Sequence, residues 1–290
     1  MPKSTQNLLE FAIKTAKKAG KIVMKNFEKP VVQEPKGIRD VVTKYDRASE
    51  EFIVGEIKKH FPDHEILGEE GGLRHITKQK NAKNSDKNFK HNSAIKHKDS
   101  YLWLVDPIDG TKNFARKLPM FAVSIGLYKN GEPLMGVVYN PYMKDLFYAE
   151  KGKGAYRENL VTKKHRIHVT KTKRIVDAVF ATGFHPEDAY LNLPIFADIT
   201  YKSFATRRTG SAAIDICFTA CGIFDGFWEY HLKPWDIAAG NLILQEAGGK
   251  FTNFDGTKLD FKQEKYLCSN GVLHKTLIKE IKFALKKGFK

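Results

Sequence analysis

Two aspartates, Asp106 and Asp109, stand three positions apart in the stretch WLVDPIDGTKNF. Carboxylates held close together on a stiff turn repel each other and raise one another's pKa, unless a cation or a hydrogen-bond donor lies between them. Hard oxygen ligands of this kind suit Mg²⁺. This stretch alone leaves open a simpler alternative, an Asp-Pro turn in which the first aspartate only caps the backbone.

The residues around the two aspartates predict a strand, a turn and the start of a helix. The apolar run 101–105 is rich in β-forming residues, so we expect a buried strand that ends where Asp106 begins. Pro107 stiffens the turn, and Gly110 frees the backbone before Thr111, which is a good helix N-cap residue. Backbone amides at such a helix start would seat a phosphate, so a metal and an anion could lie side by side.

Other acidic residues fall at similar places, at the end of a predicted strand or the start of a predicted helix. The segment EILGEEGG places Glu69 and Glu70 directly after a short apolar strand, and PWDIAAG places Asp236 at the head of a Pro-initiated helix. Asp46 precedes a predicted helix that Pro62 ends. Carboxylates grouped at the ends of elements are what a site for several Mg²⁺ ions requires. Taken singly, Asp46 could be only a helix cap, and Glu70 is interpreted as a solvent-facing neighbour rather than a ligand.

Helices and strands alternate along the rest of the chain. The apolar periodicity predicts a helix over residues 4–27, and the turn signals predict hairpins over 121–141 and 145–159. A further strand is expected over 175–184. The remaining predictions are a small-residue helix and an aromatic strand within 210–228, and a helix from 234 that ends at Gly248-Gly249. This interleaving predicts an α/β fold of the layered α+β kind rather than a strand sandwich or a helix bundle.

The length and composition are those of an ordinary globular protein. The 290 residues can form one large domain or two closely joined halves, which we place at 1–150 and 151–290. No apolar stretch approaches the roughly 20 residues that span a bilayer, and the first residues do not resemble a signal peptide, so we expect no membrane association and a cytoplasmic location. Cys217, Cys221 and Cys268 are predicted to be buried thiols.

The formal net charge of +16 is concentrated in one segment. Between Arg74 and Lys98, one arginine and seven lysines stand against the single acid Asp86, so this segment supplies +7 of the total. It is polar and aperiodic, which predicts a basic flexible insertion over 74–99. An RNA-binding or partner-binding role is the alternative, although Phe89 is the only aromatic residue for stacking on bases.

The four acidic motifs together resemble those of the inositol monophosphatase family. DVVTKYD, GEE, DPIDGTKNF and PWDIAAG occur in the family's order and approximate spacing, and residues 207–249 resemble bacterial inositol-1-monophosphatases in particular. The basic insertion is the main departure from the family pattern. The resemblance implies a layered α-β-α-β-α sandwich with the site between an N-terminal and a C-terminal half. It also implies a homodimer and a lithium-sensitive phosphatase that uses two or three Mg²⁺ ions.

The resemblance also implies roles for individual residues. Thr111, hydrogen-bonded to Asp46, would act with Glu69 to orient and deprotonate the attacking water. The implied metal ligands are Glu69, Asp106, the backbone carbonyl of Ile108, Asp109 and Asp236. The implied substrate contacts are Asp109, Gly110, Thr111, Ser211, Ala212, Glu229 and Asp236. Lys36 lies near a family position associated with the third ion, but the local length differs by a residue and we assign it no role.

The favoured substrate is inositol 1-phosphate, a small-molecule phosphate monoester. Related enzymes that act on 3′-phosphoadenosine 5′-phosphate, fructose 1,6-bisphosphate or histidinol phosphate share these motifs, so these substrates remain alternatives. A different class of function is also a hypothesis: the protein could bind RNA or the transcription machinery through its basic surface.

Overall fold

The computed structural model describes residues 5–25, 27–29, 32–37, 40–74, 100–185 and 189–288. The predicted basic insertion lies outside these ranges, apart from Arg74. The helices are α1 (Thr5–Met24), α2 (Lys44–His60), α3 (Thr111–Ala115), α4 (Ala189–Lys202), α5 (Ala212–Ala220), α6 (Pro234–Glu246), α7 (His274–Lys287) and the short 3-10 helix η2 (Ile175–Asp177). The strands are β1 (Gln33–Gly37), β2 (Asp40–Thr43), β3 (Glu65–Gly68), β4 (Gly72–Arg74), β5 (Tyr101–Asp109), β6 (Ala122–Lys129), β7 (Glu132–Asn140), β8 (Asp145–Glu150), β9 (Ala155–Glu158), β10 (His165–Arg166), β11 (Val179–Thr182), β12 (Ala205–Arg207), β13 (Gly226–Tyr230), β14 (Lys250–Asn253) and β15 (Lys265–Ser269).

Two large sheets form the framework of the molecule. The larger has eight strands in the order β10-β9-β8-β7-β6-β5-β3-β4, and the smaller has five in the order β12-β11-β13-β15-β14. In the larger sheet β3 and β5 run parallel, and the other neighbours are antiparallel. In the smaller sheet β11 runs parallel to both β12 and β13. β1 and β2 form a separate two-stranded ribbon.

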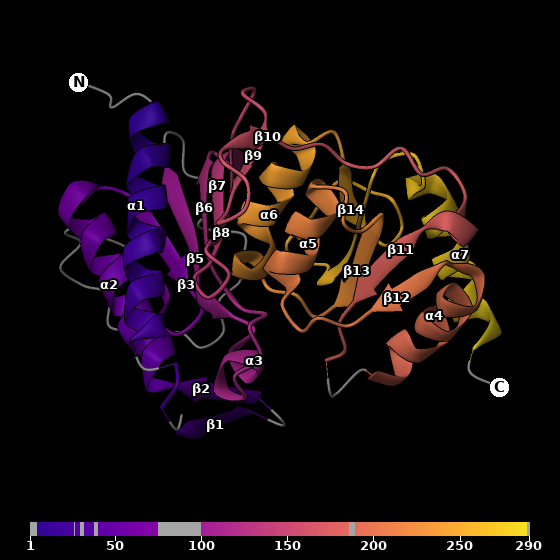
Figure 1. Ribbon diagram of the computed structural model, residues 1–290, viewed down its shortest axis with the longest axis horizontal. Coiled ribbons are helices and arrows are strands. Elements are labelled where there is room, and N and C mark those ends of the chain that lie inside the picture. The colour runs from indigo at the N-terminus through magenta and orange to yellow at the C-terminus, as the bar shows by residue number, and fades with distance from the viewer. Residues whose placement is uncertain are drawn as a thin grey trace.

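The helices lie in three layers around these sheets (Figure 1). α1 and α2 pack on the outer face of the larger sheet, where their apolar residues share a core with β5, β6 and β7. α5 and α6 fill the space between the two sheets, and α4 and α7 cover the outer face of the smaller one. The predicted α-β-α-β-α arrangement is therefore confirmed. None of the helices within the described ranges is both long and apolar enough to cross a lipid bilayer.

Most of the predicted elements are present. The helix predicted over 4–27 is α1, and the two predicted hairpins are the antiparallel pairs β6–β7 and β8–β9. The helix predicted from residue 234 is α6, and Gly248, just beyond its end, takes the left-handed conformation expected of a C-terminal glycine, with φ of 90°. Of the three cysteines, Cys217 and Cys268 are buried as predicted, whereas Cys221 is only partly buried.

Two predicted boundaries away from the Asp106 motif are wrong. The strand expected over 175–184 spans only Val179–Thr182, because Ile175–Asp177 form a 3-10 turn instead, with an ion pair of 2.6 Å between Arg174 and Asp177. The helix expected to follow Asp46 instead begins before it, at Lys44.

One close contact fixes where α6 lies against the larger sheet. Gly136 of β7 faces the backbone of α6, and a Cβ atom placed on Gly136 would lie 2.4 Å from the carbonyl oxygen of Ala239. Only a residue without a side chain allows this approach. Since α6 begins two residues before Asp236, this packing also sets the position of a predicted metal ligand.

Gly136→Ala is expected to destabilise the protein by about 1–3 kcal/mol, because the added methyl group must push α6 away from the sheet. The change in the urea unfolding midpoint measures this. Gly55→Ala is the matched control, since Gly55 lies exposed on α2 with no atom within 4 Å of the added Cβ. It should be neutral or slightly stabilising because alanine favours a helix. Equal effects of the two substitutions would contradict the close contact.

Candidate active site

The parallel pairing of β3 with β5 brings two of the predicted acids together. Parallel strands present their carboxyl ends at the same edge of a sheet. Gly68 is paired with Val105, and the next residue, Glu69, donates its backbone N–H to the carbonyl oxygen of Val105 at 3.1 Å. Glu69 therefore lies beside Asp106.

An irregularity in β5 turns both aspartates toward the same side. The strand does not end at Asp106 as predicted but continues to Asp109, with a shift in its register against β6 between these two residues. In a regular strand, residues three apart would face opposite sides of the sheet. Pro107 has no N–H to pair, and the Ile108 N–H donates to Oδ1 of Asp106 at 3.0 Å instead of to a neighbouring strand. Both aspartates consequently border one pocket.

The predicted hydrogen bond between Thr111 and Asp46 is confirmed. The Thr111 hydroxyl lies 2.8 Å from Oδ1 of Asp46 and 3.0 Å from the carbonyl oxygen of Ile108. Asp46 is fully buried, and its other oxygen accepts the Thr43 N–H at 2.8 Å, which caps α2. Asp46 thus both caps its helix and holds Thr111. Thr111 is not the N-cap of α3, because Gly110 occupies that position with φ of 89°.

The start of α5 holds the second aspartate of β5. Oδ2 of Asp109 accepts hydrogen bonds from the Ser211 hydroxyl and, at 2.8 Å, from the Ala213 N–H. Ser211 is buried beneath Asp109, and neither Ser211 nor Ala212 borders the pocket. Their contact with a substrate stays a prediction.

The helix layer between the sheets and the smaller sheet contribute two further acidic side chains, Asp236 and Glu229. Asp236 lies in the first turn of α6, where its Oδ2 accepts the Lys233 N–H at 2.7 Å. Glu229 comes from β13, and its carboxylate lies so close to Gly183 that a Cβ atom on that glycine would be 1.9 Å from Oε1. Both sheets and α6 therefore contribute acidic side chains to one place.

These residues line a pocket of about 200 Å³. Its walls comprise Glu69, Asp106, Ile108, Asp109, Gly110, Thr111, Lys112, His185, Gly210, Glu229, Tyr230, His231, Leu232 and Asp236. Sequence reasoning did not find Lys112, His185, Gly210, Tyr230, His231 or Leu232. His185 and His231 follow strands of the smaller sheet, and no motif in the sequence links them to the acidic residues.

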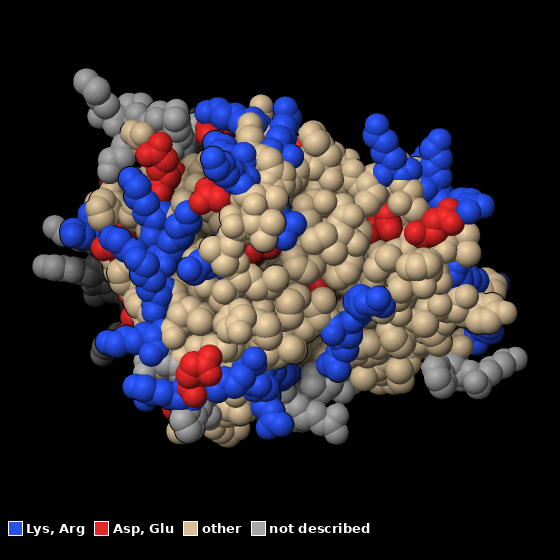
Figure 2. Space-filling view, viewed as in Figure 1, with Lys and Arg blue, Asp and Glu red and all other residues tan. Residues whose placement is uncertain are grey.

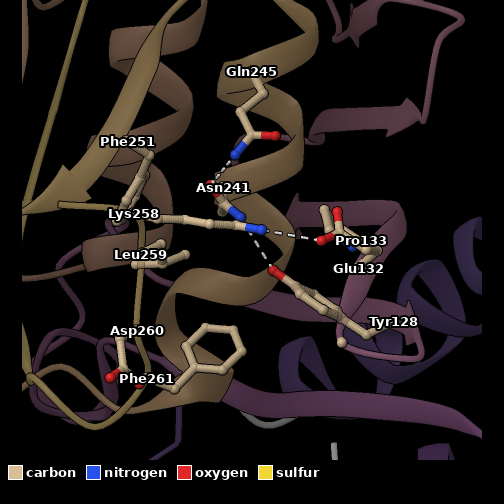
Figure 3. A pocket seen from close by; sticks show the side chains of 11 residues that line it. Tyr128, Glu132, Pro133, Asn241, Gln245, Phe251, Lys258, Leu259, Asp260 and Phe261 are labelled. Carbon is tan, nitrogen blue, oxygen red and sulfur yellow. Dashed lines mark hydrogen bonds and ion pairs between the residues drawn. The ribbon is translucent and has the colours of Figure 1, made fainter. Parts of the chain in front are cut away.

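A larger pocket of about 300 Å³ lies elsewhere, between α6 and the segment 258–261 (Figure 3). Its polar groups already pair with one another. Asn241 donates to the Tyr128 hydroxyl at 3.2 Å, Gln245 donates to Asn241 at 2.8 Å, and Lys258 lies 3.1 Å from Glu132. The smaller pocket gathers more ionisable groups, and such groups rather than volume supply catalytic chemistry, so we take the smaller pocket as the candidate active site.

Burial raises the pKa of each acid at the inner end of this pocket. The pKa of Glu69 rises to about 7 and that of Asp109 to about 6. The pKa values of Asp106 and Asp236 lie well above the usual range, because neighbouring carboxylates add repulsion to the cost of burial. A bound cation would remove much of this cost, and oxygen donors in this number suit a hard divalent ion.

Lys36 supplies a positive charge at the edge of this group. Its Nζ lies 3.0 Å from Oε1 of Glu69 and 2.8 Å from Oε1 of Glu70. Burial opposes the charge on Lys36, but the two glutamates outweigh it and raise the lysine's pKa. The interpretation of Glu70 as solvent-facing is wrong, since its side chain is only 12% exposed and is held by Lys36. As the side chains lie in this structure, no three His, Cys, Asp or Glu residues of the described ranges form a group that could hold a metal ion.

Comparison with known proteins identifies the class of protein that this fold and pocket belong to. The model of the inositol monophosphatase family matches residues 4–286, so the chain belongs to that family, which is a family of phosphatases. The chain is 40% identical to the fructose-1,6-bisphosphatase/inositol-1-monophosphatase of Aquifex aeolicus over 249 residues, 84% of each chain. It is 36% identical to the Nus factor SuhB of Haemophilus influenzae over 95% of this chain and 96% of the relative. The crystal structure of the extragenic suppressor protein suhB from Bartonella henselae superimposes with a TM-score of 0.83 at 32% identity, covering 95% of this chain and 98% of that one.

The raised pKa of Glu69 predicts a pH-dependent loss of stability in the presence of a chelator. Between pH 4.5 and about 7 the folded protein holds a proton on Glu69 that the unfolded chain has released. Its free energy of unfolding must therefore fall as the pH rises through this range. Glu69→Gln removes the effect, so the stability of the wild type relative to this variant should decline from pH 4.5 to 7 and then level off.

Urea unfolding of both proteins at half-unit pH steps measures this difference. The variant Glu51→Gln, at an exposed position on α2, controls for the loss of one acidic group. A difference that grows in favour of the wild type with rising pH would contradict the assignment.

Proposed function

We propose that the protein hydrolyses phosphate monoesters of polyols with Mg²⁺, and that inositol 1-phosphate is its favoured substrate. The observation that carries this proposal is the meeting of Glu69, Asp106, Asp109 and Asp236 in one pocket, beside the hydrogen-bonded pair of Thr111 and Asp46. The name of the Aquifex aeolicus relative includes both inositol-1-monophosphatase and fructose-1,6-bisphosphatase, so it supports this substrate and one of its alternatives.

By the chemistry of its donors the acidic end of the pocket suits two or three Mg²⁺ ions, but its side chains would have to draw together on binding, because no three of them in the described residues already form a metal-holding group. The ligands would be the side chains of Glu69, Asp106, Asp109 and Asp236 with the backbone carbonyl of Ile108. When bound, Mg²⁺ would make a water molecule more acidic and stabilise the charge of the leaving group. Lys36 contacts only Oε1 of Glu69, so the other oxygen of this carboxylate would be the one to bind an ion.

Thr111, Asp46 and Glu69 would orient the attacking water and remove its proton. The Thr111 hydroxyl donates its proton within the protein, to Asp46 at 2.8 Å or to Ile108 at 3.0 Å. Its oxygen therefore presents lone pairs that can accept a hydrogen bond from water and orient it. Glu69, on the adjoining wall, would take the proton.

The remaining residues would place the ester. The backbone amides of Gly110 and Thr111 lie at the start of α3, where N–H groups have no partner within the helix and could hold the phosphate. Asp109 and Asp236 would border the substrate where it meets the metal. Glu229, at the side of the smaller sheet, suits a polyol because a carboxylate accepts hydrogen bonds from hydroxyl groups. Ser211 and Ala212 remain predicted substrate contacts, and Ser211 also donates a hydrogen bond to Asp109. A homodimer, lithium sensitivity and a cytoplasmic location remain predictions from the sequence.

Asp109→Asn is expected to lower kcat for inositol 1-phosphate by about 100-fold or more, because the amide cannot replace a charged metal ligand. Phosphate release measures the rate, and far-ultraviolet circular dichroism verifies that the fold persists. Asp63→Asn, at an exposed position after α2, is the matched control and should retain full activity. Near wild-type turnover by a folded Asp109→Asn enzyme would refute the metal assignment.

Four substrates compared side by side test the preferred ester: inositol 1-phosphate, 3′-phosphoadenosine 5′-phosphate, fructose 1,6-bisphosphate and histidinol phosphate. We expect kcat/KM for inositol 1-phosphate to exceed the others about tenfold, which corresponds to roughly 1.4 kcal/mol of transition-state discrimination. A preference for another of the four would keep the reaction and replace the substrate.

We propose RNA binding along α1 as a second function. Lys14, Lys18 and Lys21 of α1 are exposed and recur at helical spacing, and exposed Lys25 just beyond its end continues the same basic stripe. Figure 2 shows lysine and arginine side chains gathered along α1. The net charge of +16 and the name of the Nus factor relative support this second proposal.

Replacing the four stripe lysines by glutamine should weaken RNA binding and make its salt dependence shallower. A single-stranded RNA releases about 0.7 counterions for each phosphate neutralised, so the slope of log K against log salt should fall by up to about 3. The matched control replaces Lys275, Lys279, Lys282 and Lys286, an exposed stripe with the same spacing on α7. Equal losses from both sets would indicate attraction to net charge alone and contradict a site on α1.

A further inference from the structure

The candidate pocket has two chemically different ends. One end is formed by the carboxylates of the larger sheet and α6, which include Asp106 and Asp236. Beyond Glu229, the walls include His185 and His231, which follow β11 and β13 of the smaller sheet. Neither histidine is used in the hydrolysis proposed above, so both are available for another task.

His185 has a buried nitrogen with nothing to bind. Its Nδ1 is inaccessible to solvent and has no hydrogen-bond partner in the described part of the chain. A buried polar atom left unpaired is costly, and a turn of the imidazole about its Cβ–Cγ bond would bring Nδ1 toward the pocket, where a ligand would pair with it. Gly183, two residues earlier, touches the carboxylate of Glu229. His185 therefore belongs to the same wall as the glutamate.

His231 packs beside the ring of His185. The two ring centroids lie 5.3 Å apart. His231 has a φ of 61°, a left-handed conformation that is uncommon for a residue other than glycine, and such strain persists only where the surroundings enforce it. Glu264, in the segment before β15, enforces this conformation. Its carbonyl oxygen accepts the His231 N–H, and its carboxylate lies 3.5 Å from the imidazole of His231.

We propose that His185 is a specificity-determining residue. Its Nδ1 would hydrogen-bond one substrate hydroxyl, and a different hydroxyl of the same substrate would donate to Glu229. The inference rests on the proposed hydrolysis of polyol phosphates. A hydroxyl both donates and accepts, so it satisfies Nδ1 in either tautomer of the imidazole. A second anionic group beside Glu229 fits less well, because this carboxylate is not among the proposed Mg²⁺ ligands and would repel it. The favoured class of substrate is thus a polyol phosphate with at least two hydroxyls on the side away from the ester.

The test compares two esters in two variants of His185. His185→Phe keeps a ring but loses the nitrogen, whereas His185→Asn keeps a polar atom near the position of Nδ1. His185→Phe should raise KM for inositol 1-phosphate about tenfold with little change in kcat, the effect of one hydrogen bond. His185→Asn should recover most of this loss. Neither variant should alter KM for 4-nitrophenyl phosphate, which has no such hydroxyls, and His165→Phe on the exposed strand β10 is the matched control.

Two outcomes would overturn the proposal. An unchanged KM for inositol 1-phosphate in His185→Phe would mean that water alone satisfies Nδ1, and equal losses with both esters would mean a purely structural role. The dissociation constant of inositol 1-phosphate, measured by calorimetry with Mg²⁺, separates this inference from the proposed reaction. Absent turnover with a tenfold weaker affinity in His185→Phe would refute the hydrolysis and support the contact. Equal affinities, or no binding at all, would refute the contact.

Discussion

Repulsion between buried carboxylates is the constraint on which the rest of this structure depends. The parallel pairing of β3 with β5 places Glu69 beside Asp106, and Asp109 and Asp236 join them. Such a group opposes folding at neutral pH, because each acid must lose its hydration near others of the same charge. The surrounding elements offset part of this cost with donors. Lys36 faces Glu69, the first turn of α5 donates to Asp109, and the Lys233 N–H donates to Asp236.

The layered fold explains how residues from distant parts of the sequence meet rigidly. α6 lies between the two sheets, and Gly136 lets it approach the larger sheet closely. The same helix carries Asp236 in its first turn. Glu229 comes from the smaller sheet, so the pocket spans both sheets and the helix layer between them. A substrate in this pocket would touch the acids with its phosphate end and the smaller sheet with its other end. Under the proposed function, the reaction and the choice of substrate would thus rest on different elements of the fold.

The two histidines illustrate how selectivity could be added to an unchanged reaction centre. His185 and His231 come from connections that follow strands of the smaller sheet, where residues can change without disturbing a sheet. The strained backbone of His231 is held by Glu264, which also pairs with Lys233 at 2.7 Å. Lys233 in turn donates its backbone N–H to Asp236. The outer wall is thus connected to the acidic group by a short series of contacts.

The sequence by itself determined the family, the order of helices and strands, and the acidic residues of the pocket. It could do so because these depend on local signals: apolar periodicity, turn residues, and carboxylates placed at element ends. Only the tertiary structure decided which neighbours each acid has. The register shift in β5 turns Asp109 toward Asp106, Lys36 bridges Glu69 and Glu70, and Ser211 lies beneath Asp109. These contacts join residues up to 102 positions apart. Their geometry is set by sheet pairing and helix packing, so no local pattern in the chain could reveal it.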